Sequence, residues 1–317
     1  MNSYKEIKEA ILAAENIAIA SHVSPDGDNL GSSLGLYMAL KKINKNTRIL
    51  EVDTIPENYK FLPGVEAIEE VEEDELLDVF IALDCADFER LGRNAGLAKN
   101  ARTLINIDHH ISNDLYGDLN LVEADSSSTG ELVFYLIREL GIDFDKDIAT
   151  AIYTAISSDT GSFKYSNTSG RTHSIVAELY KYDLDTELIN IELYQNKSLA
   201  KTRLFTLAMS RLESHYDDQL GLVVVTRAML EEAGAKMEDT EGLVETVRDI
   251  KPVELAILLK EKDGLVKVST RSKRRVDVSS LCANFDGGGH KRAAGCTIYA
   301  GLDEAKEKIL EKVESLI

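Results

Sequence analysis

Short apolar runs alternate with helical patterns along the first half of the chain. Four short runs are predicted strands, at residues 16–20, 47–52, 79–83 and 103–107, and the last two are apolar throughout, as expected of strands covered on both faces. Apolar positions at helical spacing predict an amphipathic N-terminal helix and further helices over 30–42, 129–140 and 147–157. This alternation predicts a doubly wound α/β domain with a mostly parallel sheet.

The second half of the chain follows a different pattern. Residues 172–212 are almost entirely helical in pattern, which indicates the closing helices of the first domain and then a helical connector. The elements expected after it are a strand at 220–226, a hairpin of 253–260 and 265–271 around Asp263-Gly264, a helix at 276–285, a strand at 295–299 and a final helix at 302–316. We therefore expect three parts: a first domain over 1–195, a connector over 196–214 and a smaller α/β domain with a mixed sheet over 215–317.

Acidic residues and histidines gather where the predicted elements of the first half end. The residues concerned are His22, Asp26 and Asp28 after the first strand, Asp84 after the third, Asp108, His109 and His110 at the end of the fourth, and Asp159 at the end of a helix. Each group alone has an ordinary explanation, such as a turn, a helix end or a satisfied pair of histidines. In a doubly wound sheet, however, ligands bind at the carboxyl ends of the strands.

Taken together, these residues predict a metal centre. Five carboxylates in one place (Asp26, Asp28, Asp84, Asp108 and Asp159) would repel one another unless cations neutralise them. A mixture of carboxylates and imidazoles suits Mn²⁺ or Mg²⁺. Two such ions that share a carboxylate can activate water and clamp a phosphate ester, and Asp84 and Asp159 are the candidates for shared positions.

These motifs resemble those of the DHH phosphoesterase family. The stretch from His22 through Pro25, Asp26 and Asp28 to Gly31-Ser32 resembles its first motif, and Asp84, the Asp-His-His triplet at 108–110 and Asp159 resemble the next three. The resemblance implies one Mn²⁺ on His22, Asp26 and Asp84, and a second on Asp28, Asp84, His109 and Asp159. It also implies that His110 faces the substrate phosphate while Asp108 orients a ligating histidine. Asn29 departs from the small residue common in the family, and we expect it to tune the loop without abolishing metal binding.

The second half carries a candidate phosphate-binding region, formed by the glycine triplet at 287–289 and by Arg271. A glycine triplet is typical of a flexible loop, or of backbone amides that approach a phosphate closely. Arginine grips a phosphate through two donors. Together with the first-half motifs, this region resembles the C-terminal domain associated with DHH proteins, which closes over the cleft and holds the nucleotide part of the substrate. The substrate-binding residues that this resemblance implies are Arg271, Ser272, Gly287, Gly288, Gly289 and His290.

Charge and composition narrow the partners. The net charge of −19 argues against long duplex nucleic acid, whose binding requires many phosphates to be neutralised. Between residues 265 and 300, however, seven basic residues face two acidic ones, which suits a short anionic substrate. The apolar runs are too short to span a bilayer, so no membrane partner is expected. Three cysteines without a CxxC pair fit a reducing compartment, and we expect a cytoplasmic protein.

The resemblance leaves the substrate open between two groups. The first degrades oligoribonucleotides of a few residues and dephosphorylates 3′-phosphoadenosine 5′-phosphate, and it is our leading hypothesis, with two Mn²⁺ ions (or Mg²⁺) as cofactors. The second hydrolyses cyclic di-AMP or its linear product pApA. A catalytically silent nucleotide sensor is the alternative from another class, although every ligand position is filled. Homodimerisation through the connector is left open.

Overall fold

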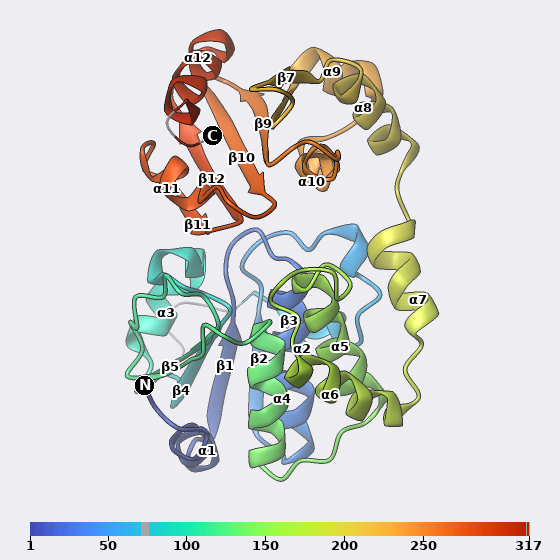
Figure 1. The fold of residues 1–317 in the computed structure, drawn as a ribbon. Helices are drawn as coiled ribbons and strands as arrows, with labels where there is room; N and C mark the ends of the chain where they lie inside the picture. The colour runs from blue at the N-terminus through green and yellow to red at the C-terminus, as the bar shows by residue number, and fades with distance from the viewer. Residues whose placement is uncertain (71–75, 315, 317) are drawn as a thin grey trace. The chain divides into compact units, whose positions relative to one another are not determined.

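The computed structural model describes residues 1–70, 76–314 and 316, and its chain divides into two compact units, Met1–Asn196 and Lys197–Ile317. The first unit contains a six-stranded parallel sheet in the order β3-β2-β1-β4-β5-β6 (Figure 1). Its strands are β1 (Asn16–Ala20), β2 (Asn46–Leu50), β3 (Ile68–Glu69), β4 (Val79–Leu83), β5 (Thr103–Asp108) and β6 (Leu119–Val122). The predicted fold class is confirmed, although the short strands β3 and β6 were not expected.

Helices cover both faces of this sheet. The helices of the first unit are α1 (Tyr4–Ala13), α2 (Gly27–Lys42), α3 (Ala95–Asn100), α4 (Thr129–Glu139), α5 (Lys146–Asp159), α6 (Gly170–Leu179) and α7 (Thr186–Asn190). Alternate residues of each strand point to opposite faces. In β1, Ile17 and Ile19 join a core with α1, α2, α4 and α5, while Ala18 and Ala20 join a smaller core with α3. This two-sided burial explains the apolar sequences of β1 and β4.

A stripe of glycines brings α2 against α5. A Cβ atom on Gly31 would lie 2.4 Å from the carbonyl oxygen of Ala151 and 2.8 Å from the amide nitrogen of Ala155. A Cβ atom on Gly27 would likewise meet the Ser158 side chain at 2.4 Å. The two helices can therefore approach closely only because these positions lack side chains. As a result, the last residues of α5 lie beside the first turn of α2.

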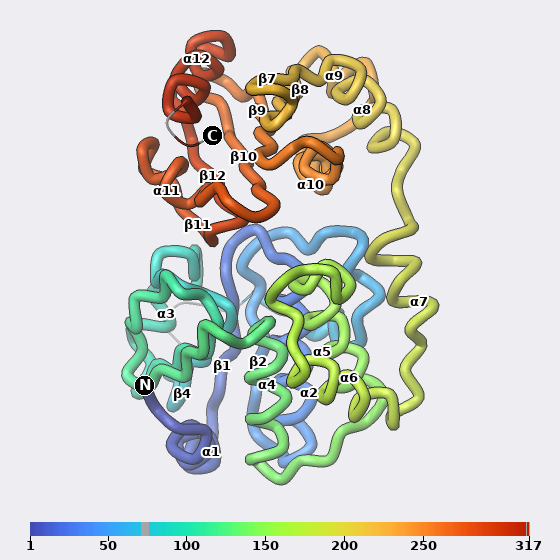
Figure 2. Tube along the Cα trace, viewed as in Figure 1, coloured from blue at the N-terminus to red at the C-terminus, as the bar shows by residue number. Residues whose placement is uncertain are grey.

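The second unit is built on a mixed sheet in the order β11-β12-β10-β9-β8-β7. Its strands are β7 (Glu213–His215), β8 (Leu220–Val225), β9 (Leu255–Lys262), β10 (Leu265–Ser272), β11 (Gly288–His290) and β12 (Ala293–Ile298), and its helices are α8 (Leu199–Met209), α9 (Arg227–Ala233), α10 (Leu243–Arg248), α11 (Val278–Ala283) and α12 (Leu302–Val313). All neighbouring strands are antiparallel except β8 and β9. Figure 2 traces the chain through these elements. The predicted hairpin is β9 and β10, and the predicted final helix ends at Val313; residue 315 of that prediction lies outside the described residues.

The region 196–214, predicted to be a helical connector, contains α8, whose Leu204 and Ala208 are fully buried in a core with α9 and β8. The glycine triplet, for which a loop was expected, contributes the short strand β11, which pairs with β12. Among the described residues, no helix is long and apolar enough to cross a membrane.

Candidate metal centre

The loop from β1 to α2 presents the first two candidate ligands. His22 is 3 % exposed, and its Nδ1 donates to the carbonyl oxygen of Val23 at 2.8 Å, which turns Nε2 toward the carboxylates. Asp26 is the N-cap of α2, where its Oδ1 accepts the amide of Asn29 at 3.0 Å. His22 Nε2 lies 3.9 Å from Asp26 Oδ2 and 3.3 Å from Asp84 Oδ2. Helix capping therefore holds one carboxylate within reach of the histidine.

Asp84 lies between two groups of ligands. It follows β4 with a positive φ of 54°, a conformation that few non-glycine residues adopt, and its amide donates to Ile107 O at 3.0 Å. While Oδ2 faces His22, Oδ1 lies 3.7 Å from His109 Nε2 and 3.6 Å from His110 Nδ1. The two oxygens of one carboxylate thus face two different sets of residues, which is the geometry required of a shared ligand.

Asp108 holds the turn that follows β5. It is fully buried, and its Oδ1 accepts His110 Nδ1 at 2.6 Å and the amides of His109 and His110 at 2.7 and 3.2 Å. Its Oδ2 accepts the amide group of Asn113 at 2.6 Å. Asp108 therefore orients the ring of His110 directly, whereas it holds His109 only through the backbone amide.

The remaining candidates meet at the first turn of α2. His109 Nε2 lies 3.6 Å from Asp28 Oδ2 and 3.6 Å from Asp159 Oδ2. Asp159 is the last residue of α5, so the close packing of α2 and α5 brings it to Asp28. Asp28 is 1 % exposed and accepts the backbone amides of Thr129 and Gly130 at 2.7 and 2.9 Å.

Three groups among the described residues have the composition and spacing of a metal site. In each group one ligand atom per residue lies within 4.8 Å of the others, and the groups are His22, Asp26 and Asp84; Asp84, His109 and His110; and Asp28, His109 and Asp159. Carboxylate oxygens and imidazole nitrogens form a donor set that fits Mn²⁺ or Mg²⁺. All the sequence-predicted metal ligands therefore lie together in the first unit.

The charges of this centre are poorly balanced by the protein alone. Burial and the nearby charges of Asp84 and Asp159 raise the pKa of Asp28 well above its usual range. Burial, only partly offset by His109, raises the pKa of Asp159 to about 6. Burial has the same tendency for Asp84, but the hydrogen bond with His22 and the charge of His110 outweigh it and lower the pKa of Asp84. Two carboxyls that tend to bind protons beside one that stays ionised form a site that divalent cations would neutralise.

His110 carries a different electrostatic character. Burial by itself lowers the pKa of its ring, but the hydrogen bond with Asp108 and the charge of Asp84 outweigh that effect and raise the pKa to about 9. A protonated imidazole beside a metal centre can stabilise the negative charge of a phosphate. The role that the resemblance implied for His110, facing the substrate phosphate, stays a prediction.

Several residues that support the centre were not identified from the sequence. Asn113 bonds to Asp108, and Asn167 donates to the Asp159 carbonyl at 3.1 Å and its Oδ2 at 3.4 Å. Thr129 Oγ1 donates to Asp84 Oδ1 at 3.0 Å. The Ser128-x-x-Glu131 pattern is a helix-start signal that could have drawn attention to this segment.

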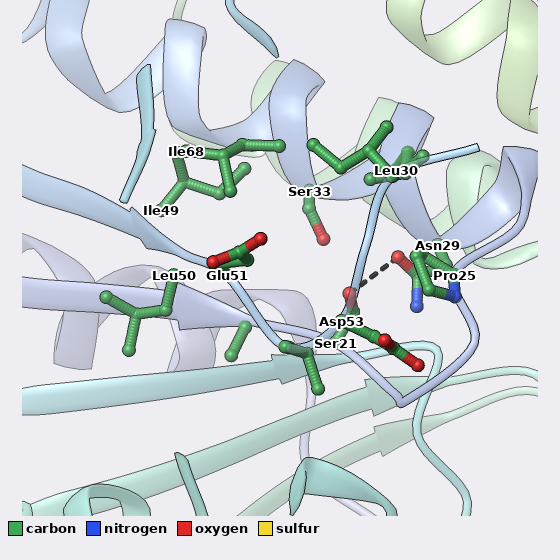
Figure 3. Close-up of a pocket in the computed structure, with 13 residues that line it drawn as sticks. Ser21, Pro25, Asn29, Leu30, Ser33, Ile49, Leu50, Glu51, Asp53 and Ile68 are labelled. Carbon is green, nitrogen blue, oxygen red and sulfur yellow. Dashed lines mark hydrogen bonds between the residues drawn. The ribbon is translucent and has the colours of Figure 1, made fainter. Parts of the chain in front are cut away.

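Asn29 ties the first motif together. Its Oδ1 accepts the Ser21 hydroxyl at 2.6 Å, drawn in Figure 3, and its Nδ2 donates to His22 O at 3.1 Å. It is fully buried and therefore holds the backbone at His22 without offering a ligand atom. The cavity beside it, lined in part by Ser21 and Ser33, measures about 20 Å³, which is enough for a water molecule but far too small for a nucleotide.

In the second unit, the predicted substrate residues are more involved in structure than expected. Arg271 Nε pairs with Glu245 Oε1 at 2.8 Å, so part of its guanidinium charge is already balanced. Ser272 is 3 % exposed, and its hydroxyl donates to Val276 O at 2.6 Å. In this structure the Ser272 hydroxyl thus holds a turn, and its binding to substrate stays a prediction.

Packing accounts for two of the three glycines at residues 287–289. A Cβ atom on Gly287 would lie 2.4 Å from Gly295 O, and one on Gly289 would lie 2.5 Å from Ala293 O. Gly289 also has a φ of 136°, which disfavours any side chain. Gly288, by contrast, has nothing within 4 Å of its Cβ position. Packing against β12 thus explains why residues 287 and 289 are glycines. Gly288 is exposed and His290 is half-buried, so these two positions are accessible to a ligand.

Comparison with known proteins agrees with this geometry. The model of the DHH family N-terminal domain matches residues 16–156, and the DHHA1 domain model matches residues 221–317. The chain is 35 % identical to the bifunctional oligoribonuclease and PAP phosphatase NrnA of Thermus thermophilus, covering 97 % of this chain and 92 % of that protein. It is 30 % identical to the Bacillus subtilis protein of the same name, covering 98 % and 97 %. The crystal structure of an exopolyphosphatase-related protein from Bacteroides fragilis superposes with a TM-score of 0.92 at 30 % identity, covering 98 % of this chain and 96 % of that one.

Proposed function

Because this chain belongs to the DHH family, we propose that its first unit is a two-metal phosphoesterase centre in which Asp84 is the shared ligand. The observation that carries the proposal is the orientation of the Asp84 carboxylate, whose two oxygens face His22 and His109 separately. Such a pair of cations activates a water molecule and stabilises the attacking and leaving oxygens of a phosphate ester.

We assign the other ligands according to the oxygen of Asp84 on whose side they lie. His22, Asp26 and Asp84 would hold one cation, and Asp28, Asp84, His109 and Asp159 would hold the other. The mixed donor set favours Mn²⁺, with Mg²⁺ as the alternative. The buried centre and the three free cysteines are compatible with a cytoplasmic enzyme.

In this proposal His110 faces the substrate phosphate, and Asp108 orients the ring of His110. Asp108 accepts the Nδ1 proton of His110, and this hydrogen bond together with the charge of Asp84 raises the pKa of the ring to about 9, which favours the protonated form at neutral pH. Its ring would offer a positive charge to the phosphate as negative charge develops on the oxygens. Asp108 contributes by fixing the orientation of that ring.

The substrates we propose are oligoribonucleotides of a few residues and 3′-phosphoadenosine 5′-phosphate. The names of the relatives at 35 % and 30 % identity, which cover nearly the whole chain, support this choice. Within the second unit, Arg271, Gly288 and His290 remain the candidates for binding substrate phosphates, together with the backbone of Gly287 and Gly289. The strong negative charge of the chain favours such short substrates over long duplexes.

A comparison of kcat/KM with Mn²⁺ tests the proposal. The substrates are 3′-phosphoadenosine 5′-phosphate, a series of RNAs of increasing length from the dinucleotide, pApA and cyclic di-AMP. We expect the shortest RNAs and the bisphosphate to be preferred, and chelation of the metal to abolish turnover of both. Dominant hydrolysis of cyclic di-AMP or pApA would contradict the proposed substrates, and tight nucleotide binding without turnover would contradict an enzyme.

A further inference from the structure

One short segment contacts the ligands proposed for the second cation, which are Asp28, Asp84, His109 and Asp159. This is the 126–130 segment, Ser-Ser-Ser-Thr-Gly, which leads into α4. Its contacts are Ser126 O with His109 Nδ1 at 3.3 Å, the amides of Thr129 and Gly130 with Asp28 at 2.7 and 2.9 Å, Thr129 Oγ1 with Asp84 Oδ1 at 3.0 Å, and Ser127 O with Asn167, which also bonds to Asp159. Four proposed ligands thus depend on the position of five consecutive residues.

The contact with His109 also selects the form of its ring. A carbonyl oxygen can only accept, so the hydrogen bond from His109 to Ser126 O requires the proton on Nδ1. Nε2 then presents its lone pair toward Asp28 and Asp159, as a metal-binding imidazole requires. The position of Ser126 therefore bears on both the orientation and the tautomer of His109.

Arg171 of α6 anchors this segment. Its Nη2 donates to Ser126 Oγ at 2.7 Å and its Nε to Glu131 Oε2 at 2.9 Å. Glu131 is fully buried and also accepts the hydroxyls of Ser126 and Ser127 at 3.1 and 2.6 Å. Arg171 further bonds to Glu123 Oε2 at 3.1 Å. A buried carboxylate that loses its cationic partner is strongly destabilised, so the pair keeps the segment in one conformation.

The first set of ligands is held by other contacts. His22 is oriented by Val23 O, and Asp26 by its capping bond with Asn29. Neither His22 nor Asp26 has a hydrogen bond with the 126–130 segment among the contacts of the described residues. The two halves of the centre therefore rest on separate supports and share Asp84.

We propose that Arg171 and Glu131 are positioning residues for the cation bound by Asp28, His109 and Asp159, and that the cation bound by His22 and Asp26 depends on them far less, because only the shared Asp84 links it to the segment. This inference rests on the proposed two-metal function. It predicts that breaking the Arg171–Glu131 pair weakens one metal site selectively. A residue that merely stabilised the fold would affect both sites or neither.

The test is a calorimetric Mn²⁺ titration of the full-length protein, with the bound ions counted by electron paramagnetic resonance. For the wild type we expect two sites. In Arg171→Met, one site should weaken by about 10- to 100-fold, as loss of a residue that orients a ligand does, while the other keeps its affinity. The matched control is Arg138→Met, which removes an exposed arginine of α4 that lies over the Phe134 ring and does not contact the 126–130 segment.

Milder variants keep the test decisive if Arg171→Met does not fold. Ser126→Ala removes one Arg171 contact but keeps the carbonyl that His109 uses, and Glu131→Gln keeps the shape of the pair; both should weaken the same site by less. Arg171→Lys should restore part of the affinity. Nitrogen-15 NMR of the metal-free protein should show His109 with its proton on Nδ1 in the wild type and a mixture of tautomers in Arg171→Met.

The outcomes separate the two proposals. Equal weakening of both sites, or two unchanged sites in Arg171→Met and Glu131→Gln, would overturn the positioning role while leaving the two-metal centre intact. A wild-type protein that binds no Mn²⁺ in the first unit would instead overturn the proposed function.

Discussion

The carboxylates of the candidate metal centre in the first unit and the charged residues of the second unit are compensated in opposite ways. The first unit places carboxylates next to one another, so that the pKa values of Asp28 and Asp159 are raised and the imidazole of His109 is their ion-pair partner. The second unit pairs its charges: Arg271 bonds to Glu245, and the buried Glu254 accepts the amides of Arg274, Arg275 and Val276. Unbalanced buried charge is typical of a site that binds a cation, whereas charges that are compensated within the protein stabilise its fold.

Removing Asp84 is the most severe test of the candidate metal centre in the first unit. Asp84→Ala takes away the carboxylate that faces both groups of ligands, so we expect kcat/KM to fall by at least about 1000-fold, in line with several kcal/mol of lost charge stabilisation. Steady-state kinetics with Mn²⁺ measures this. Asp87→Ala is the control, since it removes a nearby carboxylate that caps a different turn. Near wild-type turnover in Asp84→Ala would mean that no shared ligand is needed.

Separating α2 from α5 should damage the first unit in another way. Gly31→Ala places a methyl group 2.4 Å from Ala151 O, and the helices must move apart. We expect a loss of about 1–3 kcal/mol in the free energy of unfolding. Activity should also fall, because Asp159 at the end of α5 moves away from Asp28. Urea denaturation and kinetics check both effects, with Gly96→Ala of α3 as a control that meets no neighbour. Unchanged stability in Gly31→Ala would show that the close helix contact is dispensable.

Two variants distinguish the structural role of the Arg271–Glu245 ion pair from a role of Arg271 in substrate binding. Arg271→Met removes a donor for phosphate, and we expect KM to rise by about 30-fold with a small change in kcat, since a hydrogen bond to a charged group contributes about 1.5–3 kcal/mol. Glu245→Gln keeps Arg271 and should leave KM unchanged or lower it. If both variants lose stability equally and neither changes KM, Arg271 serves only the fold.

The pH dependence of metal binding gives the smallest expected effect. The pKa of Asp159 is raised to about 6, so lowering the pH through that value protonates the carboxylate and makes protons compete with the cation. From pH 7 to pH 5 the Kd for Mn²⁺ should rise by at least about tenfold, and protonation of Asp28 and His22 acts in the same direction. Calorimetry in buffers of different ionisation enthalpy would detect the released protons. A Kd independent of pH would show that these groups are not ligands.

The sequence predicted the first unit better than the second for a physical reason. Parallel strands end at one edge of a sheet, so His22, Asp84 and Asp108 could be placed together from the strand pattern alone. The second unit offered only residue types. Whether Ser272 faces a ligand or a carbonyl, and whether a glycine serves a phosphate or the packing of β12, depends on tertiary contacts that no local pattern carries. The same holds for Arg171, which lies 40 residues from Glu131 in the chain and contacts it only in the folded unit.

The most direct test of the two-metal centre is a crystal of the wild-type protein grown with Mn²⁺ and measured at the manganese absorption edge. The account predicts two anomalous peaks in the first unit, one within bonding distance of Asp84 Oδ2 and His22 Nε2, the other of Asp84 Oδ1 and His109 Nε2. A single peak, or two peaks of which neither contacts Asp84, would contradict it.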